Sequence, residues 1–140
     1  MRKHLYPLII LIISAFIYGA SVENSEYKAY TFINGKKVNL FVADTPELRQ
    51  KGLMHRDKLD ENSGMVFIFE KKEPVAFWMK NVKFPLDLVF ISNNKIVKIN
   101  KNVPICTSEN CPIYPCYIPV DTVIEFNAGF CEKHNIQPGQ

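Results

Sequence analysis

The residues best suited to bind a ligand gather around the single tryptophan. Trp78 is followed closely by Lys80 and Asn81, so an aromatic ring stands beside two hydrogen-bond donors. This combination is typical of sites for sugars, peptides and small polar ligands. In a strand, Phe77 and Met79 would point to one face and Trp78 and Lys80 to the other, so one of these faces belongs to the core. For Trp78 alone we favour a core position with a satisfied indole N–H, and we assign the ligand-binding role first to Lys80 and Asn81.

A buried carboxylate is predicted at Asp87, which stands among apolar neighbours in the segment Pro85–Leu88. Removing the partner of a buried charge costs about 3–5 kcal/mol, so we expect a cationic or hydrogen-bonding partner, with Arg56 and Lys80 as candidates. A structural ion pair is the more common arrangement. A ligand-binding pair is the alternative, because buried charge clusters also mark functional sites. The hypothetical ligand face therefore comprises Arg56, Trp78, Lys80, Asn81 and Asp87.

No catalytic motif stands out, so we assign no catalytic residue. H-E-x-x-H, G-x-S-x-G and P-loop patterns are absent from the sequence. The alternative function is a small envelope hydrolase that uses Asp87 as base or nucleophile, with Lys80 or Arg56 stabilising charge. Glycoside hydrolysis usually needs two carboxyl groups, so Glu125 would then have to lie near Asp87. We expect no cofactor and no metal, since nothing in the spacing of His55 and the methionines indicates a copper site.

The cysteines predict disulfides. Cys106, Cys111, Cys116 and Cys131 follow the spacing C-x4-C-x4-C-x14-C, and four cysteines in an oxidising compartment indicate two disulfides with three connectivities. Cys106 and Cys111 flank a short polar loop that a disulfide could close, which would leave Cys116 to pair with Cys131. A four-cysteine zinc site is the alternative, but the spacing lacks the paired close knuckles of structural zinc sites.

Turn signals divide the chain into short strands. Asn34-Gly35 separates two β-prone runs and predicts a hairpin. Asp44 as N-cap, with Glu47 three residues later as in a capping box, predicts a short helix that Gly52 ends. Strands are expected at residues 27–33, 36–43, 65–69, 75–79, 86–91, 96–99 and 120–127, with a long loop at 102–119 and a last helical turn within 128–135. The pattern predicts a mainly β protein, a compact jelly-roll-like sandwich or barrel with one or two short helices.

Length and composition fit one exported domain. The chain has 140 residues, 47% of them hydrophobic, which is too short for a TIM barrel or a two-domain Rossmann enzyme. Arg2 and Lys3 precede the apolar run Leu5–Tyr18 and the small residues Gly19–Ser21, which together predict a secretory signal over residues 1–21. An uncleaved membrane anchor is the alternative, although a spanning helix needs about 20 apolar residues. Without Arg2 and Lys3 the net charge falls from +3 to +1, so we expect no nucleic-acid partner. We also expect a monomer, located in the periplasm or outside the cell.

Four motifs, in a fixed order and at compatible spacing, resemble a known family. They are Gly52–Arg56, Gly64–Phe69, Phe77–Asn81 and Pro85–Ile91. The chain is similar to the domain-of-unknown-function family 192, small exported or membrane-linked bacterial and archaeal domains without an established activity. The resemblance implies a jelly-roll-like sandwich over residues 36–140, preceded by a linker and the first hairpin strand at 22–35. The resemblance also covers the Cys106 and Cys111 positions, but it does not cover Cys116 or Cys131. Relatives usually have one further short strand after the position that corresponds to residue 140.

These observations together predict a non-enzymatic binding or accessory module of the cell envelope. Its partner would be a small polar ligand held on the polar-aromatic face. An envelope protein is the other candidate partner, and an exposed apolar patch of several hundred Å² would indicate it.

Overall fold

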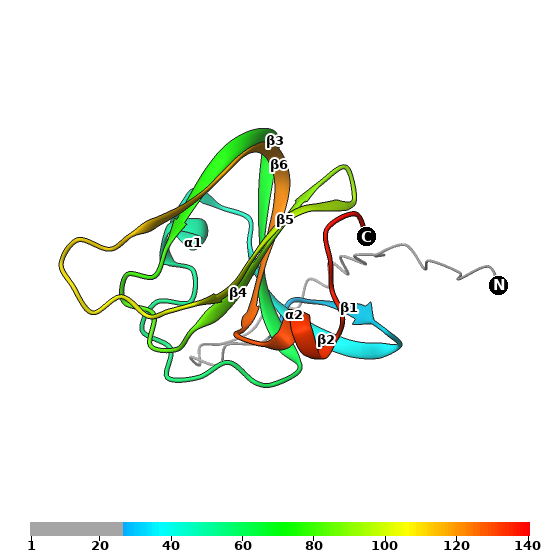
Figure 1. Cartoon of the computed structure of the whole chain (residues 1–140), viewed down its shortest axis with the longest axis horizontal. Coiled ribbons are helices and arrows are strands. Elements are labelled where there is room, and N and C mark those ends of the chain that lie inside the picture. Colours follow the sequence, from blue (N-terminus) through cyan, green and yellow to red (C-terminus); the bar gives the residue numbers. More distant parts are fainter. Residues whose placement is uncertain (1–26) are drawn as a thin grey trace, which may run out of the picture.

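The fold consists of one six-stranded sheet and two short helices (Figure 1). The computed structural model describes residues 27–140. The elements in chain order are β1 (Ala29–Ile33), β2 (Lys36–Ala43), α1 (Pro46–Lys51), β3 (Ser63–Trp78), β4 (Leu86–Ser92), β5 (Lys95–Val103), β6 (Ile113–Asn127) and α2 (Phe130–Lys133). The strand order is β1-β2-β3-β6-β4-β5, with β2 and β3 parallel and the other neighbours antiparallel. The predicted mainly β class with short helices is confirmed, and the sheet is open and not a closed barrel.

The N-terminal hairpin forms as the sequence predicts. Asn34 and Gly35 both have positive φ, 50° and 77°, as a type I′ turn between two antiparallel strands requires. The side-chain amide of Asn34 also donates a hydrogen bond to the carbonyl of His134, at 2.7 Å. The turn is therefore tied to the end of α2, a hundred residues further along the chain.

Helix α1 begins one residue later than predicted. Its N-cap is Thr45, whose hydroxyl accepts a hydrogen bond from the N–H of Leu48. With Thr45 as the cap, the predicted capping box of Asp44 and Glu47 does not form, because the third helical position belongs to Leu48. Gly52, with φ 47°, ends the helix as predicted.

Strands β3 and β6 are longer than predicted. Strand β3 joins two runs that were expected to be separate, 65–69 and 75–79, and β6 begins at Ile113, within the expected loop. The pairing between β3 and β6 shifts register between Ile68 and Glu73 and again before Val75. Bulges therefore absorb the polar segment that was interpreted as a turn, and the two strands continue together beyond it.

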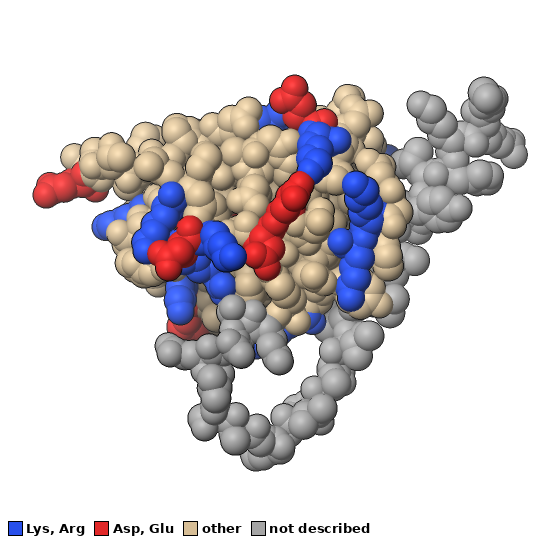
Figure 2. Space-filling view, turned by 90° about the horizontal axis from the view of Figure 1, so that it is seen from below, with Lys and Arg blue, Asp and Glu red and all other residues tan. Residues whose placement is uncertain are grey.

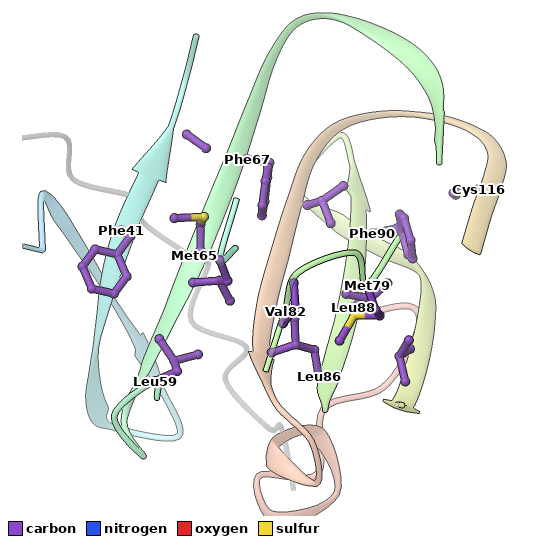
Figure 3. Packing of buried hydrophobic residues seen from close by; sticks show 14 of the residues in the cluster. Phe41, Leu59, Met65, Phe67, Met79, Val82, Leu86, Leu88, Phe90 and Cys116 are labelled. Carbon is purple, nitrogen blue, oxygen red and sulfur yellow. The ribbon is translucent and has the colours of Figure 1, made fainter. Parts of the chain in front are cut away.

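The far half of the β3–β6 pair bends over one face of its own sheet (Figure 1). Val75 and Phe77 of β3 and Cys116 of β6 pack there against the core. The Phe77 ring lies edge-on to Phe67 and Phe90, with centroids 5.0 and 5.9 Å away. Figure 3 shows Phe67, Phe90 and Cys116 in this cluster. The bend makes two layers from one sheet, which is compatible with the predicted sandwich.

Buried side chains lie on both faces of the sheet. Along β4, Leu88 belongs to the cluster under the bent strands and Val89 to the opposite cluster; along β6, Val123 and Ile124 alternate in the same way. We call the first the ribbon face, because the bent β3–β6 ribbon covers it. The second is the α2 face, because Phe130 of α2 packs on it.

The C-terminal residues pair with part of the edge strand β5. The N–H of Ile96 donates to the carbonyl of Gln140, and the N–H of Gly139 donates to the carbonyl of Ile96, both at 2.8 Å. The start of β5 is thus covered by the last residues of this chain.

The cysteines form one disulfide and not two. Cys106 and Cys111 are bonded, as predicted, with Cα atoms 5.6 Å apart. Cys116 and Cys131 are free and buried. The predicted Cys116–Cys131 pairing is wrong, because Cys116 packs on the ribbon face and Cys131 on the α2 face, so the sheet separates the two thiols.

Residues 1–26 lie outside the described part of the chain. The predicted secretory signal at 1–21 and the polar linker that follows it fall there, so the structure bears on neither. Within residues 27–140, neither helix has the length and apolar character needed to cross a membrane.

Candidate functional site

Two loops that carry predicted ligand residues are bound to each other. The loop after α1 meets the loop between β3 and β4 where the N–H of His55 donates to the carbonyl of Asn81, at 2.9 Å. Both residues have positive φ, 64° and 57°, so each loop turns sharply at this junction. An exposed ion pair between Lys83 and Asp57, 2.5 Å long, joins the same loops. Asn81 therefore contributes its backbone to holding the loops together, beside Lys80.

Trp78 ends β3 at the surface. It is 42% exposed, so the core position favoured for it is wrong, whereas Phe77 packs into the ribbon-face cluster. The predicted alternation of faces is thus confirmed. The ammonium of Lys80 lies 5.2 Å from the centroid of the Trp78 ring, a contact that contributes about 0.5–1 kcal/mol at an exposed site.

Arg56 lies apart from this pair. Its guanidinium stacks over the ring of Phe41, with the central carbon 3.8 Å from the ring centroid. The long side chain therefore covers apolar surface at the edge of the ribbon-face cluster. No ion pair joins Arg56 to Asp87 within the described residues.

Asp87 is a structural residue of the α2 face. It is fully buried, and each carboxylate oxygen accepts a backbone N–H: Oδ1 from Asn102 at 2.8 Å and Oδ2 from Cys131 at 2.9 Å. The predicted ion pair with Arg56 or Lys80 is not formed, because these two amides already satisfy the carboxylate. Burial, together with the neighbouring Asp87 charge, raises the pKa of the Cys131 thiol to about 12.

A second buried carboxyl group, that of Glu125, lies on the ribbon face. In the register of β4 and β6, Leu88 stands opposite Glu125 and Asp87 opposite Phe126. Since neighbouring side chains in a strand point to opposite faces, the sheet separates the two carboxyl groups. This geometry excludes the pairing of Asp87 with Glu125 that glycoside hydrolysis would need.

Glu125 has no partner for its charge. The side chain is only 5% exposed, and the two ion pairs found in residues 27–140 are Lys83–Asp57 and Lys133–Glu61. Burial alone raises the pKa of the Glu125 carboxyl group to about 8, because neither a cation nor a hydrogen-bond donor offsets the lost hydration.

Glu125 lines a small pocket beside α1. The pocket has a volume of about 30 Å³, roughly two to three times the space that one water molecule needs. Its lining comes from the end of α1 and the turn after it, from β3, from the β3–β4 loop and from β6: Arg49, Gln50, Lys51, Gly52, Leu53, Met54, Phe67, Phe77, Trp78, Val82 and Glu125. Of the five predicted ligand residues, Trp78 alone lies in this lining.

Close packing of β3 against β6 fixes the backbone of Glu125. A Cβ atom at Gly64 would lie 2.7 Å from the carbonyl oxygen of Glu125 and 2.9 Å from the ring of Phe126. Glycine is therefore required where β3 approaches this part of β6.

Arg49 holds α1 over the pocket. Its Nη1 donates to the carbonyls of Asp44 and Ile68, at 2.9 and 2.8 Å, and its guanidinium lies over the Phe69 ring. These contacts clamp the helix to β3. They also engage the cation that would otherwise be available to neutralise Glu125.

The pocket can act as a hydrogen-bonding or ionic site. With a pKa of about 8, the Glu125 carboxyl group is mostly protonated at pH 7 and can donate a hydrogen bond. A cationic ligand group would favour the carboxylate form. Within residues 27–140, no three side chains of His, Cys, Asp or Glu are grouped so as to hold a metal ion.

Sequence reasoning missed most of the pocket because four separate segments form its lining. Residues 49–51 at the end of α1 lie just before the Gly52–Arg56 motif, and the only role considered for Glu125 was as a partner of Asp87. A signal for Glu125 was nevertheless present. The alternation predicted for 120–127 places it on the same face as Val123, which is a core position.

The domain was compared with known families. The model of DUF192, described as "Uncharacterized ACR", matches residues 29–140. The chain belongs to this family. The match confirms the predicted resemblance, and it includes β1 and every residue that lines the pocket of this DUF192 domain.

Two solved structures are similar to this DUF192 domain. One, from Sinorhizobium meliloti 1021, is described as a candidate transcription regulator; it is 35% identical, has a TM-score of 0.68, and the match covers 74% of this chain and 79% of that one. The other, from Novosphingobium aromaticivorans DSM 12444, is described as a protein of unknown function; it is 29% identical, with a TM-score of 0.68 and coverage of 74% and 72%. The comparison with curated proteins gives no match. The similarities establish the family and the fold, and neither description names a ligand.

Proposed function

We propose that this DUF192 domain is a non-enzymatic binding module of the cell envelope, and that a small polar ligand enters the Glu125 pocket. The observation that carries the proposal is the unpartnered carboxyl group of Glu125, 5% exposed and lining a pocket. A buried polar group without a partner is destabilising. A ligand that supplies the missing partner would remove that cost.

The surroundings of the pocket support a binding role. Its inner lining is apolar and aromatic, with Phe67 and Phe77, while its rim includes the exposed residues Gln50, Lys51 and Trp78. Small-ligand sites commonly combine an apolar lining with a few polar groups. Lys80 lies over Trp78 and could extend such a site beyond the rim.

The hydrolase alternative has less support. Both oxygens of Asp87 accept backbone N–H groups, and the residue is fully buried on the α2 face. A fully buried carboxylate held in this way does not face solvent, and neither Lys80 nor Arg56 lies within ion-pair distance of it in residues 27–140.

Export is part of the proposal. The Cys106–Cys111 disulfide supports it, because disulfides persist in oxidising compartments and are rare in the cytosol. The apolar run before residue 21 supports it as a secretory signal. Intact-mass analysis of the protein from the periplasmic fraction would show a chain that begins near Val22. The full-length mass in the membrane fraction would indicate the tethered form instead.

We retain the expectation that nucleic acid is not the partner, although one similar structure is described as a candidate regulator. On the face seen in Figure 2, Lys and Arg lie beside Asp and Glu and form no continuous basic surface. The balanced charge of the chain without its N-terminal segment points the same way.

A ligand screen on the purified full-length protein tests the binding role. Trp78 is the only tryptophan and lines the pocket, so its emission reports on ligands bound there. The panel would contain oligosaccharides, peptidoglycan fragments, peptides, nucleotides and amines. A ligand at 100 times its Kd should add about 2.7 kcal/mol to the free energy of unfolding.

Three variants separate pocket binding from general effects. Glu125→Gln should abolish the response while the fold is retained, and Glu70→Gln, which changes an exposed glutamate outside the pocket, should leave it unchanged. Lys80→Ala should weaken ligands that extend over Trp78. A panel in which no compound alters the emission or the stability of the wild type would contradict the proposal.

An envelope protein is the second candidate partner. Trp78 and Ile113 are paired across the ribbon, and Tyr117 lies further along β6; Ile113 and Tyr117 are 63% and 82% exposed. Tyr114 and Cys116 point to the core, so Ile113 and Tyr117 point outward. Exposed aromatic and aliphatic residues of this kind are common where proteins dock. Crosslinking from Tyr117 in intact cells would identify such a partner.

A further inference from the structure

The chemistry of the Glu125 pocket indicates the class of its ligand. We propose that the pocket binds the terminal ammonium group of a primary amine, as found at the end of a lysine-like side chain or an alkylamine. This inference rests on the proposed function, because it names the ligand of that same site.

The first argument is the missing positive charge. Two cationic side chains line the pocket, those of Arg49 and Lys51. Arg49 is engaged by the carbonyls of Asp44 and Ile68, and Lys51 is exposed at the end of α1. Neither acts on the Glu125 carboxyl group, whose pKa is raised by burial alone. The site therefore contains an acidic group that has no counter-charge within residues 27–140 and that a cationic ligand group would ionise.

The second argument is size. The pocket has a volume of about 30 Å³, whereas a water molecule needs roughly 10–15 Å³ by the same measure. A primary ammonium group has about the size of a water molecule, so it fits together with the carbon atom that carries it.

The third argument is the lining. Phe67 and Phe77 lie in the wall of the pocket, edge to face with each other. An apolar and aromatic wall suits the methylene groups that precede a terminal amine. An ammonium group would therefore meet a carboxyl group and aromatic carbon in one small space, and the rest of the ligand would extend past Trp78 toward solvent.

Binding would release one proton from Glu125 to solvent. Before the ligand binds at pH 7, most Glu125 carboxyl groups carry a proton, since the pKa is about 8. The ammonium ion favours the carboxylate, so the carboxyl proton passes to solvent as the ion pair forms, and the ligand keeps its own protons. The affinity should then rise by up to tenfold per pH unit between about pH 6 and pH 8 and level off above that. A neutral hydrogen-bond acceptor, bound by the protonated carboxyl group, would show the opposite slope.

The test compares three small probes on the full-length protein: n-butylammonium chloride, n-butanol and acetamide. Binding is measured at constant ionic strength by the emission of Trp78 and by titration calorimetry at about pH 6, 7 and 8. We expect n-butylammonium to bind most tightly, with an affinity that rises with pH. Glu125→Gln should weaken it by at least about tenfold and remove the pH dependence, while Glu70→Gln should change neither.

The pH series on the wild type keeps the test valid if Glu125→Gln folds poorly. Tighter binding of n-butanol or acetamide, or an affinity for n-butylammonium that is flat or falls with rising pH, would overturn the amine assignment and leave a binding pocket for another ligand class. No response to any of the three probes would also overturn it. The binding role itself would then be decided by the wider panel.

Discussion

Asp87 and Glu125 are two buried carboxyl groups at neighbouring positions of one sheet, and their surroundings differ completely. Asp87 points to the α2 face and accepts two backbone N–H groups. Glu125 points to the ribbon face and lines a pocket without a donor or a cation to neutralise it. The first group joins three segments of the fold, namely β4, the end of β5 and α2. The second makes no comparable contact with another segment, and this difference is the basis of the proposed ligand site.

Removing the Asp87 side chain should have the largest effect on stability. Asp87→Ala leaves the N–H groups of Asn102 and Cys131 without their acceptor, and we expect a loss of about 3–5 kcal/mol in the free energy of unfolding. Urea denaturation followed by Trp78 fluorescence measures it. Asp87→Asn keeps one acceptor oxygen and should lose less.

Glu125→Gln at pH 7 or above should show the opposite sign, a gain in stability. A loss as large as that of Asp87→Ala would mean that Glu125 also has a structural partner. The contrast between the two faces would then be wrong.

The pH dependence of stability should isolate Glu125. Its pKa is about 8 in the folded state and near 4.5 in the unfolded chain, so between these values the folded state holds a proton that the unfolded state releases. The free energy of unfolding therefore falls as pH rises, by about 1.4 kcal/mol per pH unit from this group. Unfolding curves of the wild type and Glu125→Gln between about pH 5 and pH 8 should diverge with this slope.

His134 changes the free energy of unfolding with pH in the opposite direction. The contribution of Glu125 must therefore be measured as the difference between the wild type and Glu125→Gln. Burial lowers the pKa of His134, so the unfolded chain takes up a proton below about pH 6.5 that the folded state excludes, and this contribution to stability falls as pH falls. The effect is present in both proteins and cancels in their difference. Parallel curves for the wild type and Glu125→Gln would contradict the raised pKa of Glu125.

The sequence allowed the class of the fold and much of its local structure to be predicted. The Asn34-Gly35 hairpin, the end of α1 at Gly52 and the disulfide of Cys106 with Cys111 all depend on residues near one another in the chain. Such features follow from local turn geometry. The predicted burial of Asp87 is also confirmed, since it followed from apolar neighbours in the same strand.

What could not be predicted depends on which strands become neighbours. The partners of Asp87 come from Asn102 and Cys131, and both are backbone groups that carry no signature in the side-chain sequence. The continuous strand β3 depends on β6 running beside it through the bulges. The Glu125 pocket likewise appears only once α1 is placed over β3 and β6.

Gly64→Ala should disturb both sides of the comparison: its methyl group would point to the α2 face, where Phe126 and Asp87 lie, and would also press on the backbone of Glu125. A methyl group at Gly64 would meet the carbonyl oxygen of Glu125 at 2.7 Å, so β3 and β6 must move apart there. We expect a loss of about 1–3 kcal/mol, as for other overpacked sites. We also expect weaker binding of n-butylammonium, because the carboxyl group shifts with its backbone. Wild-type stability and affinity in this variant would show that the strands do not approach so closely.

Cys131→Ala should have the smallest effect on the free energy of unfolding. It tests how much the side chain of residue 131 contributes to the surroundings of Asp87. The backbone N–H of residue 131 donates to Asp87, so alanine keeps this bond and loses the packing of one buried sulfur atom and the contact of the thiol with Asp87. We expect a loss of about 1 kcal/mol, well below that of Asp87→Ala. Alkylation of the unfolded, unreduced chain should label two thiols in the wild type and one in Cys131→Ala, because Cys116 and Cys131 are free. A loss of stability comparable to that of Asp87→Ala would mean that the thiol itself stabilises the α2 face. If alkylation labels no thiols in the wild type, Cys116 and Cys131 form a disulfide.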